Sequence, residues 1–155
     1  MVRLQNKSKG FTIVELLIVI VVIGILATLV IVTFTGIQQK ARDSKRKTDL
    51  GAIQSSLENF YGSNNYYPTL AQLNDGTPST GWRAVNLKGF DPNALYDPKM
   101  PTADQSAPLK SAADDTHYGY VPTPTGCDNS ATPCTNYTVT ATLEAGGTFS
   151  KQSNN

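Results

Sequence analysis

The chain has 155 residues, enough for one domain with an appendage, and its formal net charge is only +1. Two cysteines and a single histidine, His117, are too few ligands for a typical four-ligand zinc site. No motif for nucleophilic catalysis and no paired-carboxylate motif is present. We therefore expect a protein that is not an enzyme, with His117 on the surface or on a sheet face.

Residues 11–34 form an apolar segment in which Glu15 is the one charged residue. As a helix this segment is about 36 Å long, more than the hydrocarbon core of about 30 Å, which predicts a transmembrane helix. A cleaved secretory signal is the alternative, although its apolar core would be only about 7–15 residues long. A carboxylate beside such a segment is costly, so Glu15 is predicted to have a specific partner. The alternative is that it simply reaches the lipid headgroups.

Charge and cysteines disagree about the orientation of this segment. Three basic residues precede it and five follow it: Arg3, Lys7 and Lys9, then Lys40, Arg42, Lys45, Arg46 and Lys47. Counted naively, the positive-inside rule places the C-terminal part in the cytoplasm. The pair Cys127 and Cys134, in a stretch rich in Gly, Pro, Asn and Ser, predicts a disulfide instead, with free thiols or a metal as alternatives. A disulfide favours an exported C-terminal part and an N-terminus that stays inside.

The helix is predicted to continue past the apolar segment, because no proline occurs between Phe11 and Tyr67. Residues 35–61 are amphipathic, first weakly and then strongly. The weak stripe consists of Ile37, Ala41, Ser44 and Thr48, and the strong one of Leu50, Ile53, Leu57, Phe60 and Tyr61. We expect the helix to end near Tyr61, before the turn-forming sequence Gly62-Ser63-Asn64-Asn65.

The remaining residues, 62–155, are predicted to form a small head. A short helix is expected at 69–74, loops at 75–108, and strands at 117–121, 137–144 and 148–151. The cysteine segment would join the first two strands, and Gly146-Gly147 would form the hairpin turn into the last one. The predicted fold class is α+β: a long N-terminal helix whose first half is transmembrane, with a small antiparallel sheet packed on its second half.

The sequence Gly10-Phe11-Thr12-x-x-Glu15-Leu16, after a basic leader, resembles the type IV prepilin signature. The stretches Ile23–Ala27, Ala41-Arg42-Asp43 and Tyr66-Tyr67-Pro68 are also similar to pilins and pseudopilins. The resemblance implies the pilin fold. It also implies a leader peptide (1–10), a transmembrane and filament-core helix (11–34), an amphipathic continuation (35–61) and a globular head (62–155).

The resemblance further implies how the chain works. A prepilin peptidase would cut between Gly10 and Phe11 and methylate the new amine of Phe11, and Glu15 would pair with the amine of a neighbouring subunit. The product would be a homo-oligomeric helical filament, built with an assembly platform and minor pilins. The subunit would first be a single-pass protein of the inner, cytoplasmic membrane with its N-terminus in the cytoplasm, and then part of a cell-surface filament.

Within this class, a pilus subunit for adhesion, motility or DNA uptake is preferred, because a pseudopilin-type calcium motif is missing. A pseudopilin of a type II secretion system is the alternative, and a monomeric binding domain on a single membrane anchor is the alternative from another class.

Two weaker hypotheses concern charged residues. The bases between Lys40 and Lys47 could contact DNA, with a solvated helix face as the alternative reading. Four carboxylates are weak calcium candidates, although their spacing is not that of an EF-hand and no cofactor is expected: Asp97, Asp104, Asp114 and Asp115.

Overall fold

The computed structural model describes residues 10–155, without the side chains of residues 31–33. The predicted leader lies outside the described residues except for Gly10, and so do Arg3, Lys7 and Lys9. The chain divides into two compact units, Met1–Gln38 and Gln39–Asn155, and the helix α1 (Ile13–Asn64) belongs to both. We call Gln39–Asn155 the compact unit.

α1 has 52 residues and confirms the long helix predicted from the absence of proline. It ends three residues later than expected, because the first left-handed residue is Asn65, with φ 60°. The side chain of Asn64 also donates to the Phe60 carbonyl at 2.9 Å, which continues the last turn.

The first part of α1 is exposed along its whole apolar surface. Every side chain of residues 11–30 is exposed, including Phe11 at 89%. By length and composition, α1 is the one helix of the described chain that could cross a membrane. A helix that is apolar on all sides needs an apolar surrounding, either lipid or other helices.

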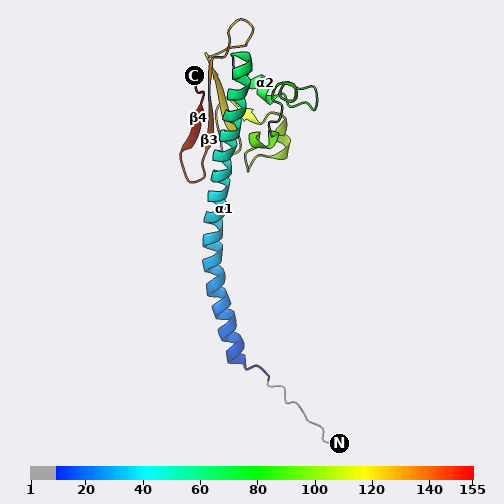
Figure 1. Cartoon of the computed structure of the whole chain (residues 1–155). Coiled ribbons are helices and arrows are strands. Elements are labelled where there is room, and N and C mark those ends of the chain that lie inside the picture. Colours follow the sequence, from blue (N-terminus) through cyan, green and yellow to red (C-terminus); the bar gives the residue numbers. More distant parts are fainter. Residues whose placement is uncertain (1–9) are drawn as a thin grey trace, which may run out of the picture. The chain divides into compact units, whose positions relative to one another are not determined.

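A four-stranded sheet lies in the compact unit, in the order β1 (Leu109–Lys110), β2 (Tyr118–Thr123), β3 (Asn136–Thr142), β4 (Thr148–Gln152). β2 and β3 are antiparallel, with Tyr120 opposite Val139, and so are β3 and β4. The hairpin turn between β3 and β4 forms where predicted, since Gly146 and Gly147 both have positive φ. In Figure 1, β3 and β4 run alongside the second half of α1.

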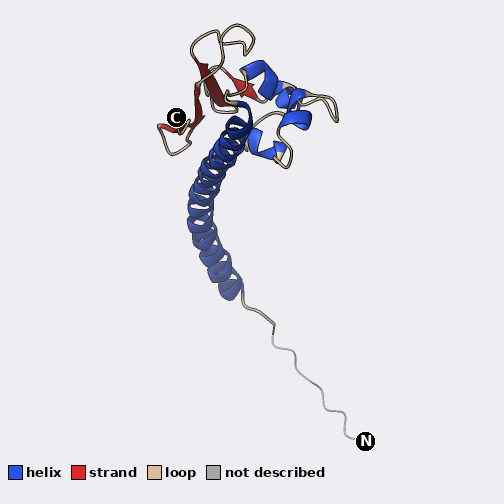
Figure 2. Ribbon diagram, turned by 45° about the horizontal axis from the view of Figure 1, so that its top comes forward, coloured by secondary structure: helices blue, strands red, loops and turns tan. Residues whose placement is uncertain are grey.

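The predicted α+β fold class is confirmed, and the three predicted strands form the antiparallel part of the sheet, β2 to β4. The strand β1, which pairs with β2 in parallel, was not predicted, because a strand of two residues shows no alternation of apolar and polar residues. One expectation about the head was wrong, because the segment 75–108 is more ordered than a loop. It contains the helix α3 (Trp82–Asn86) and the 3₁₀ helices η1 (Pro92–Leu95) and η2 (Thr102–Ser106). The expected helix at 69–74 is present as α2 (Leu70–Asn74), capped by Thr69. Figure 2 shows these short helices on one side of the end of α1 and the strands on another.

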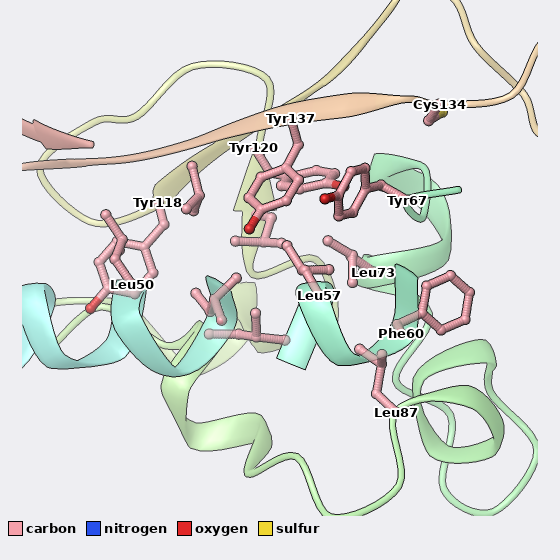
Figure 3. Close-up of a cluster of buried hydrophobic side chains, with 14 of the residues drawn as sticks. Leu50, Leu57, Phe60, Tyr67, Leu73, Leu87, Tyr118, Tyr120, Cys134 and Tyr137 are labelled. Carbon is pink, nitrogen blue, oxygen red and sulfur yellow. The ribbon is translucent and has the colours of Figure 1, made fainter. Parts of the chain in front are cut away.

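The core of the compact unit lies between α1 and the sheet, as the two hydrophobic patterns predict. Leu50, Ile53, Leu57 and Phe60 form the buried stripe of α1. On β3 the buried side chains alternate, and Figure 3 shows Tyr137 pointing toward the helix.

Tyrosines fill much of this core, and the hydroxyl groups of the four buried ones, Tyr67, Tyr118, Tyr120 and Tyr137, all donate to an acceptor. Glu58, a charged residue of α1, accepts from Tyr67 and Tyr137, each at 2.9 Å. Tyr120 donates to the Pro68 carbonyl at 2.7 Å. The rings of Tyr67 and Tyr137 meet edge to face, with centroids 4.7 Å apart. The core is therefore specified by hydrogen bonds as well as by apolar area.

The predicted disulfide between Cys127 and Cys134 is confirmed, and it lies in the loop that joins β2 to β3. In the chain-entropy model a loop this short gives roughly 2–3 kcal/mol of stability. The loop also holds the chain after α1, because the Tyr67 amide donates to the Cys134 carbonyl at 2.7 Å and the Asn129 side chain donates to the Tyr67 carbonyl at 2.8 Å.

Candidate functional site

The residues around the predicted cut form a capping box at the start of α1. The amide and hydroxyl groups of Thr12 both donate to Oε2 of Glu15 at 2.8 Å, and the Glu15 amide donates to the Thr12 hydroxyl at 3.2 Å. These reciprocal bonds satisfy backbone donors that a helix leaves free at its N-terminus. Gly10 and Phe11 precede the cap and are exposed.

The capping box fixes the carboxylate of Glu15 at the first turn of the helix, where the helix dipole also favours a negative charge. The spacing Thr12-x-x-Glu15 is itself a capping-box motif, so this local partner of Glu15 was readable from the sequence. A carboxylate has two oxygens and about four acceptor positions, so one that accepts from the neutral groups of Thr12 can still bind a cation.

A second arrangement of charged groups occupies the compact unit. We call it the ionic cluster, and it consists of Arg42, Asp43, Arg46, Asp97, Lys99 and Glu144. At its centre Arg46 is fully buried. Its Nε and Nη2 atoms donate to the two oxygens of Asp97 at 2.6 and 3.0 Å, and Nη1 donates to Asp43 at 2.8 Å. Such a two-pronged contact is the strongest geometry for a guanidinium and a carboxylate.

Glu144 joins the β3–β4 turn to the same cluster. Arg42 donates to its two oxygens at 2.5 and 2.7 Å, and Arg46 and Lys99 approach it at 3.1 and 3.2 Å. Asp43 in turn accepts from the backbone amides of Glu144 and Ala145 at 2.9 and 3.0 Å. The three cations and three anions of the cluster balance, as burial of charge requires.

The pKa values in this region follow from these contacts. The hydrogen bonds from Arg42 lower the pKa of Glu144 to about 2, against the smaller effect of burial. Burial raises the pKa of Asp43. The hydrogen bonds from the backbone amides of Glu144 and Ala145 and from Arg46 together outweigh burial, so the pKa lies below its ordinary value. Next to the cluster, burial raises the pKa of Asp49, although Lys45 and Tyr118 donate to it.

The ionic cluster overturns the prediction for the start of the amphipathic helix. The expected weak stripe is exposed: Ile37, Ala41, Ser44 and Thr48. The compact unit covers Asp43, Arg46 and Asp49 instead. Pattern reading assigns charged residues to solvent, so it selected the wrong face here.

The bases between Lys40 and Lys47 do not form one basic face, contrary to the premise of the DNA hypothesis. Arg46 is buried, while Arg42 and Lys45 pair with Glu144 and Asp49. Lys47 lies over the ring of Phe149, 5.8 Å from its centroid.

The calcium candidates are not brought together. Both oxygens of Asp97 bind Arg46, and Asp114 accepts from Lys110 and Thr116. Asp104 approaches Nε2 of His117 at 3.5 Å, and Asp115 is exposed. Within residues 10–155, no three His, Cys, Asp or Glu side chains are grouped to hold a metal ion.

His117 was expected at the surface or on a sheet face, and this expectation was wrong. It precedes β2 and is only 3% exposed. Its Nδ1 lies 2.8 Å from the Thr116 hydroxyl and 3.2 Å from Asp114.

Comparison with known proteins bears on the capping-box end of the chain. Residues 5–31 match the model of the prokaryotic N-terminal methylation motif. Over its N-terminal half the chain resembles pilins and pseudopilins. The resemblance stated from Gly10, Phe11 and Glu15 is thereby confirmed.

Three curated relatives illustrate the extent of this resemblance. The type II secretion system core protein G of Escherichia coli K12 is 39% identical over 70 residues, which are 45% of this chain and 48% of that protein. Core protein G of Klebsiella michiganensis is 38% identical over 96 residues, or 61% and 62% of the two chains. The type IV major pilin protein PilA of Myxococcus xanthus is 33% identical over 81 residues, or 52% and 37%.

The chain thus spans about half the length of most of the pilin-like relatives that it matches. No solved structure matches it.

Replacement of Arg46 by alanine tests the ionic cluster. Because Asp43 and Asp97 would stay buried without their cation, we expect the free energy of unfolding to fall by about 3–5 kcal/mol. Denaturant unfolding of the full chain in detergent can be followed by the fluorescence of its single tryptophan, Trp82, which packs on Phe60. The matched control is Lys40→Ala at an exposed position, and equal losses in the two variants would contradict the assigned role.

The free energy of unfolding of the compact unit should also fall at acidic pH. The pKa of Glu144 is lower in the folded chain than its ordinary value of 4.5, so its contribution is complete above that pH and is lost as the pH falls toward 2. We expect a loss on the order of 2 kcal/mol over this range. Glu144→Gln should be less stable at pH 7 and show a flatter decline below pH 4.5. If the stability of this variant declined with falling pH as steeply as that of the native chain, Glu144 would be excluded as the cause of the decline.

Proposed function

We propose that this chain is a prepilin-type structural subunit that is cut between Gly10 and Phe11, methylated at Phe11 and polymerised through Glu15. The observation that carries the proposal is the capped Glu15 at the start of a helix whose apolar surface is exposed from residue 11 to 30. The methylation motif over residues 5–31 supports the same reading. In this proposal residues 1–10 are the leader, 11–34 the membrane and filament-core helix, 35–61 its continuation and 62–155 the head.

Before assembly, residues 11–34 would lie in the inner membrane, with the leader in the cytoplasm and the disulfide-bonded compact unit outside. Removal of the leader takes away Arg3, Lys7 and Lys9 and creates a cationic amine on Phe11. A prepilin peptidase is therefore the first partner that the proposal requires.

In this proposal the capping box also holds the carboxylate of Glu15 ready to bind an amine. Bonds from Thr12 hold the carboxylate in one position, so little side-chain entropy is lost when the amine of a neighbouring Phe11 binds it. Helices in lipid gain little from apolar contact alone, because the lipid tails are equally apolar. An ion pair at a low-dielectric position can therefore decide the axial register in which two apolar helices pack.

The filament could be a pilus or a pseudopilus. The pilus reading, with an assembly platform and minor pilins as partners and with adhesion, motility or DNA uptake as its use, is supported by the similarity to the Myxococcus xanthus pilin. A pseudopilus of a type II secretion system is the second candidate. It is favoured by the similarity to core protein G of several bacteria, which in one of them extends over 96 residues.

A monomeric binding domain on a membrane anchor remains the alternative from another class. Such a protein needs an apolar helix but neither a cut after Gly10 nor a free amine on Phe11. The mature N-terminus therefore distinguishes the two functions.

Mass spectrometry of the chain purified from membranes should show a mature protein that begins with N-methylated Phe11. A Gly10→Val variant, in which a bulky side chain obstructs the cut, should keep its leader. An intact Met1, or a cut beyond Ala27, in the native chain would refute the proposal.

Two substitutions separate the charge of Glu15 from its capping role. Glu15→Gln keeps an acceptor for Thr12 but removes the charge, so we expect membrane insertion and processing to continue while assembled filament falls at least about tenfold, the effect of about 1.4 kcal/mol per contact. Thr12→Val removes the two capping bonds that involve the hydroxyl, keeps the bond from the backbone amide and keeps the charge of Glu15, and should reduce assembly less. The measurements are the amount of sheared filament and the fraction of processed subunit in the membrane.

The same two measurements give the outcome that contradicts the ion pair. Normal filaments from Glu15→Gln would show that the charge is not needed, and a greater loss in Thr12→Val than in Glu15→Gln would assign the effect to capping.

A further inference from the structure

Arg83, in α3, is a buried cation with an unused donor. It is 8% exposed, and its Nη1 is the one buried side-chain nitrogen or oxygen atom of the described residues that has no hydrogen-bond partner. A guanidinium stays charged at any physiological pH, and buried charges are normally paired. Arg83 therefore differs from Arg46, whose three carboxylate partners belong to the chain itself.

Within the chain, the side chain of Arg83 interacts with the Tyr96 hydroxyl and, at longer range, with the carboxylate of Asp75, which is already engaged. Asp75 accepts from the Thr77 hydroxyl at 3.0 Å and from the Trp82 amide at 2.8 Å. These bonds shape the loop before α3. No salt bridge joins Arg83 to any carboxylate in the described part of the chain.

Arg83 lies where two surface pockets meet. Their volumes are about 400 and 430 Å³, and Gly76, Pro78 and Arg83 line both. The guanidinium rests on the backbone of Gly76, since a Cβ atom there would come within 1.7 Å of Nη2. Glycine at position 76 thus leaves room for the side chain of Arg83 in the wall that the two pockets share.

The smaller pocket has the chemistry of an anion site. Besides Arg83 it is lined by Lys88 and by no acidic residue, and its other side chains are mainly apolar: Ala84, Leu87, Phe90 and Pro92, with Pro78. The larger pocket contains Asp75 and polar side chains, which suit an anion less well. A guanidinium matches the two oxygens of a carboxylate, and an apolar wall suits a hydrocarbon group.

We propose that the pocket formed by Arg83, Lys88 and Phe90 binds a carboxylate carried on a short apolar group. The charged end would pair with Arg83 and Lys88, and the apolar part would lie against Phe90 and Leu87. The carboxylate could come from a free organic acid or from a second copy of this chain, and the experiment separates these sources. The proposal does not depend on the prepilin function.

The test is a titration of the full chain in detergent, labelled with ¹⁵N-arginine and followed by the NMR signals of its four arginine side chains. The probes are butyrate, its neutral analogue butyramide, and inorganic phosphate. We expect butyrate to shift the Arg83 signal to saturation and to leave the Arg42 and Arg46 signals in place. Butyramide should have no effect, and phosphate should bind at least about tenfold more weakly because it lacks an apolar group.

Three variants locate the site. Gly76→Ala should displace the flexible end of Arg83 and weaken butyrate binding by about tenfold. Lys88→Gln should weaken it by about threefold, as expected for one exposed charge. Lys151→Gln, which removes a lysine from β4, is the matched control and should bind normally. The Trp82 fluorescence of each variant reports that the compact unit is folded.

Dilution of the protein distinguishes the two sources of the carboxylate, a free acid and a second copy of the chain. An Arg83 signal that moves with protein concentration, and that butyrate reverses, identifies a second copy as the donor. A signal that responds to butyrate at every protein concentration identifies a free acid. The proposal is overturned if butyrate leaves Arg83 unmoved, if butyramide acts equally, or if Gly76→Ala binds like the unmodified chain.

Discussion

The guanidinium of Arg46 lies fully buried where α1, the loop after η1 and the β3–β4 turn come together. A charge in that position is tolerated only with its partners in place, so the three segments must meet in one register. Asp43 reinforces this by accepting the turn's backbone amides. The apolar stripe from Leu50 to Phe60 supplies most of the buried area, but it is non-directional, whereas the ionic cluster specifies where along the helix the sheet is held.

Much of the fold could be predicted, because the patterns concerned are local. The long helix, the buried stripe of α1 and the alternation on β3 all follow from spacing within one element. The disulfide was expected from two cysteines seven residues apart. At the candidate site, Gly10, Phe11 and Glu15 were found by resemblance, and the capping bond to Thr12 is readable from their spacing. Their roles in processing and assembly stay predictions.

What could not be predicted depends on partners distant in the sequence. Arg46 finds Asp97 51 residues away and Glu144 98 residues away, and nothing near Arg46 marks it as buried. The same holds for Glu58, whose tyrosine partners include one 79 residues along the chain, and for the pockets at Arg83. Charged residues on an amphipathic helix are assigned to solvent by default, so the contacts of Arg46 and Glu58 were missed for this reason. The pockets at Arg83 were missed because they lie in a segment that was predicted as loops.

The long sequence separations within the ionic cluster have a consequence for folding. Closing a loop of 98 residues costs chain entropy before its contacts can compensate, so the bonds between Arg46 and Glu144 belong among the last to form. Until the β3–β4 turn is in place, Arg42 and Arg46 lack their Glu144 partner and that side of the cluster remains hydrated. The ionic cluster is therefore completed by a residue near the C-terminal end of the chain. A chain that ends before residue 144 lacks the carboxylate that joins the sheet to this part of α1.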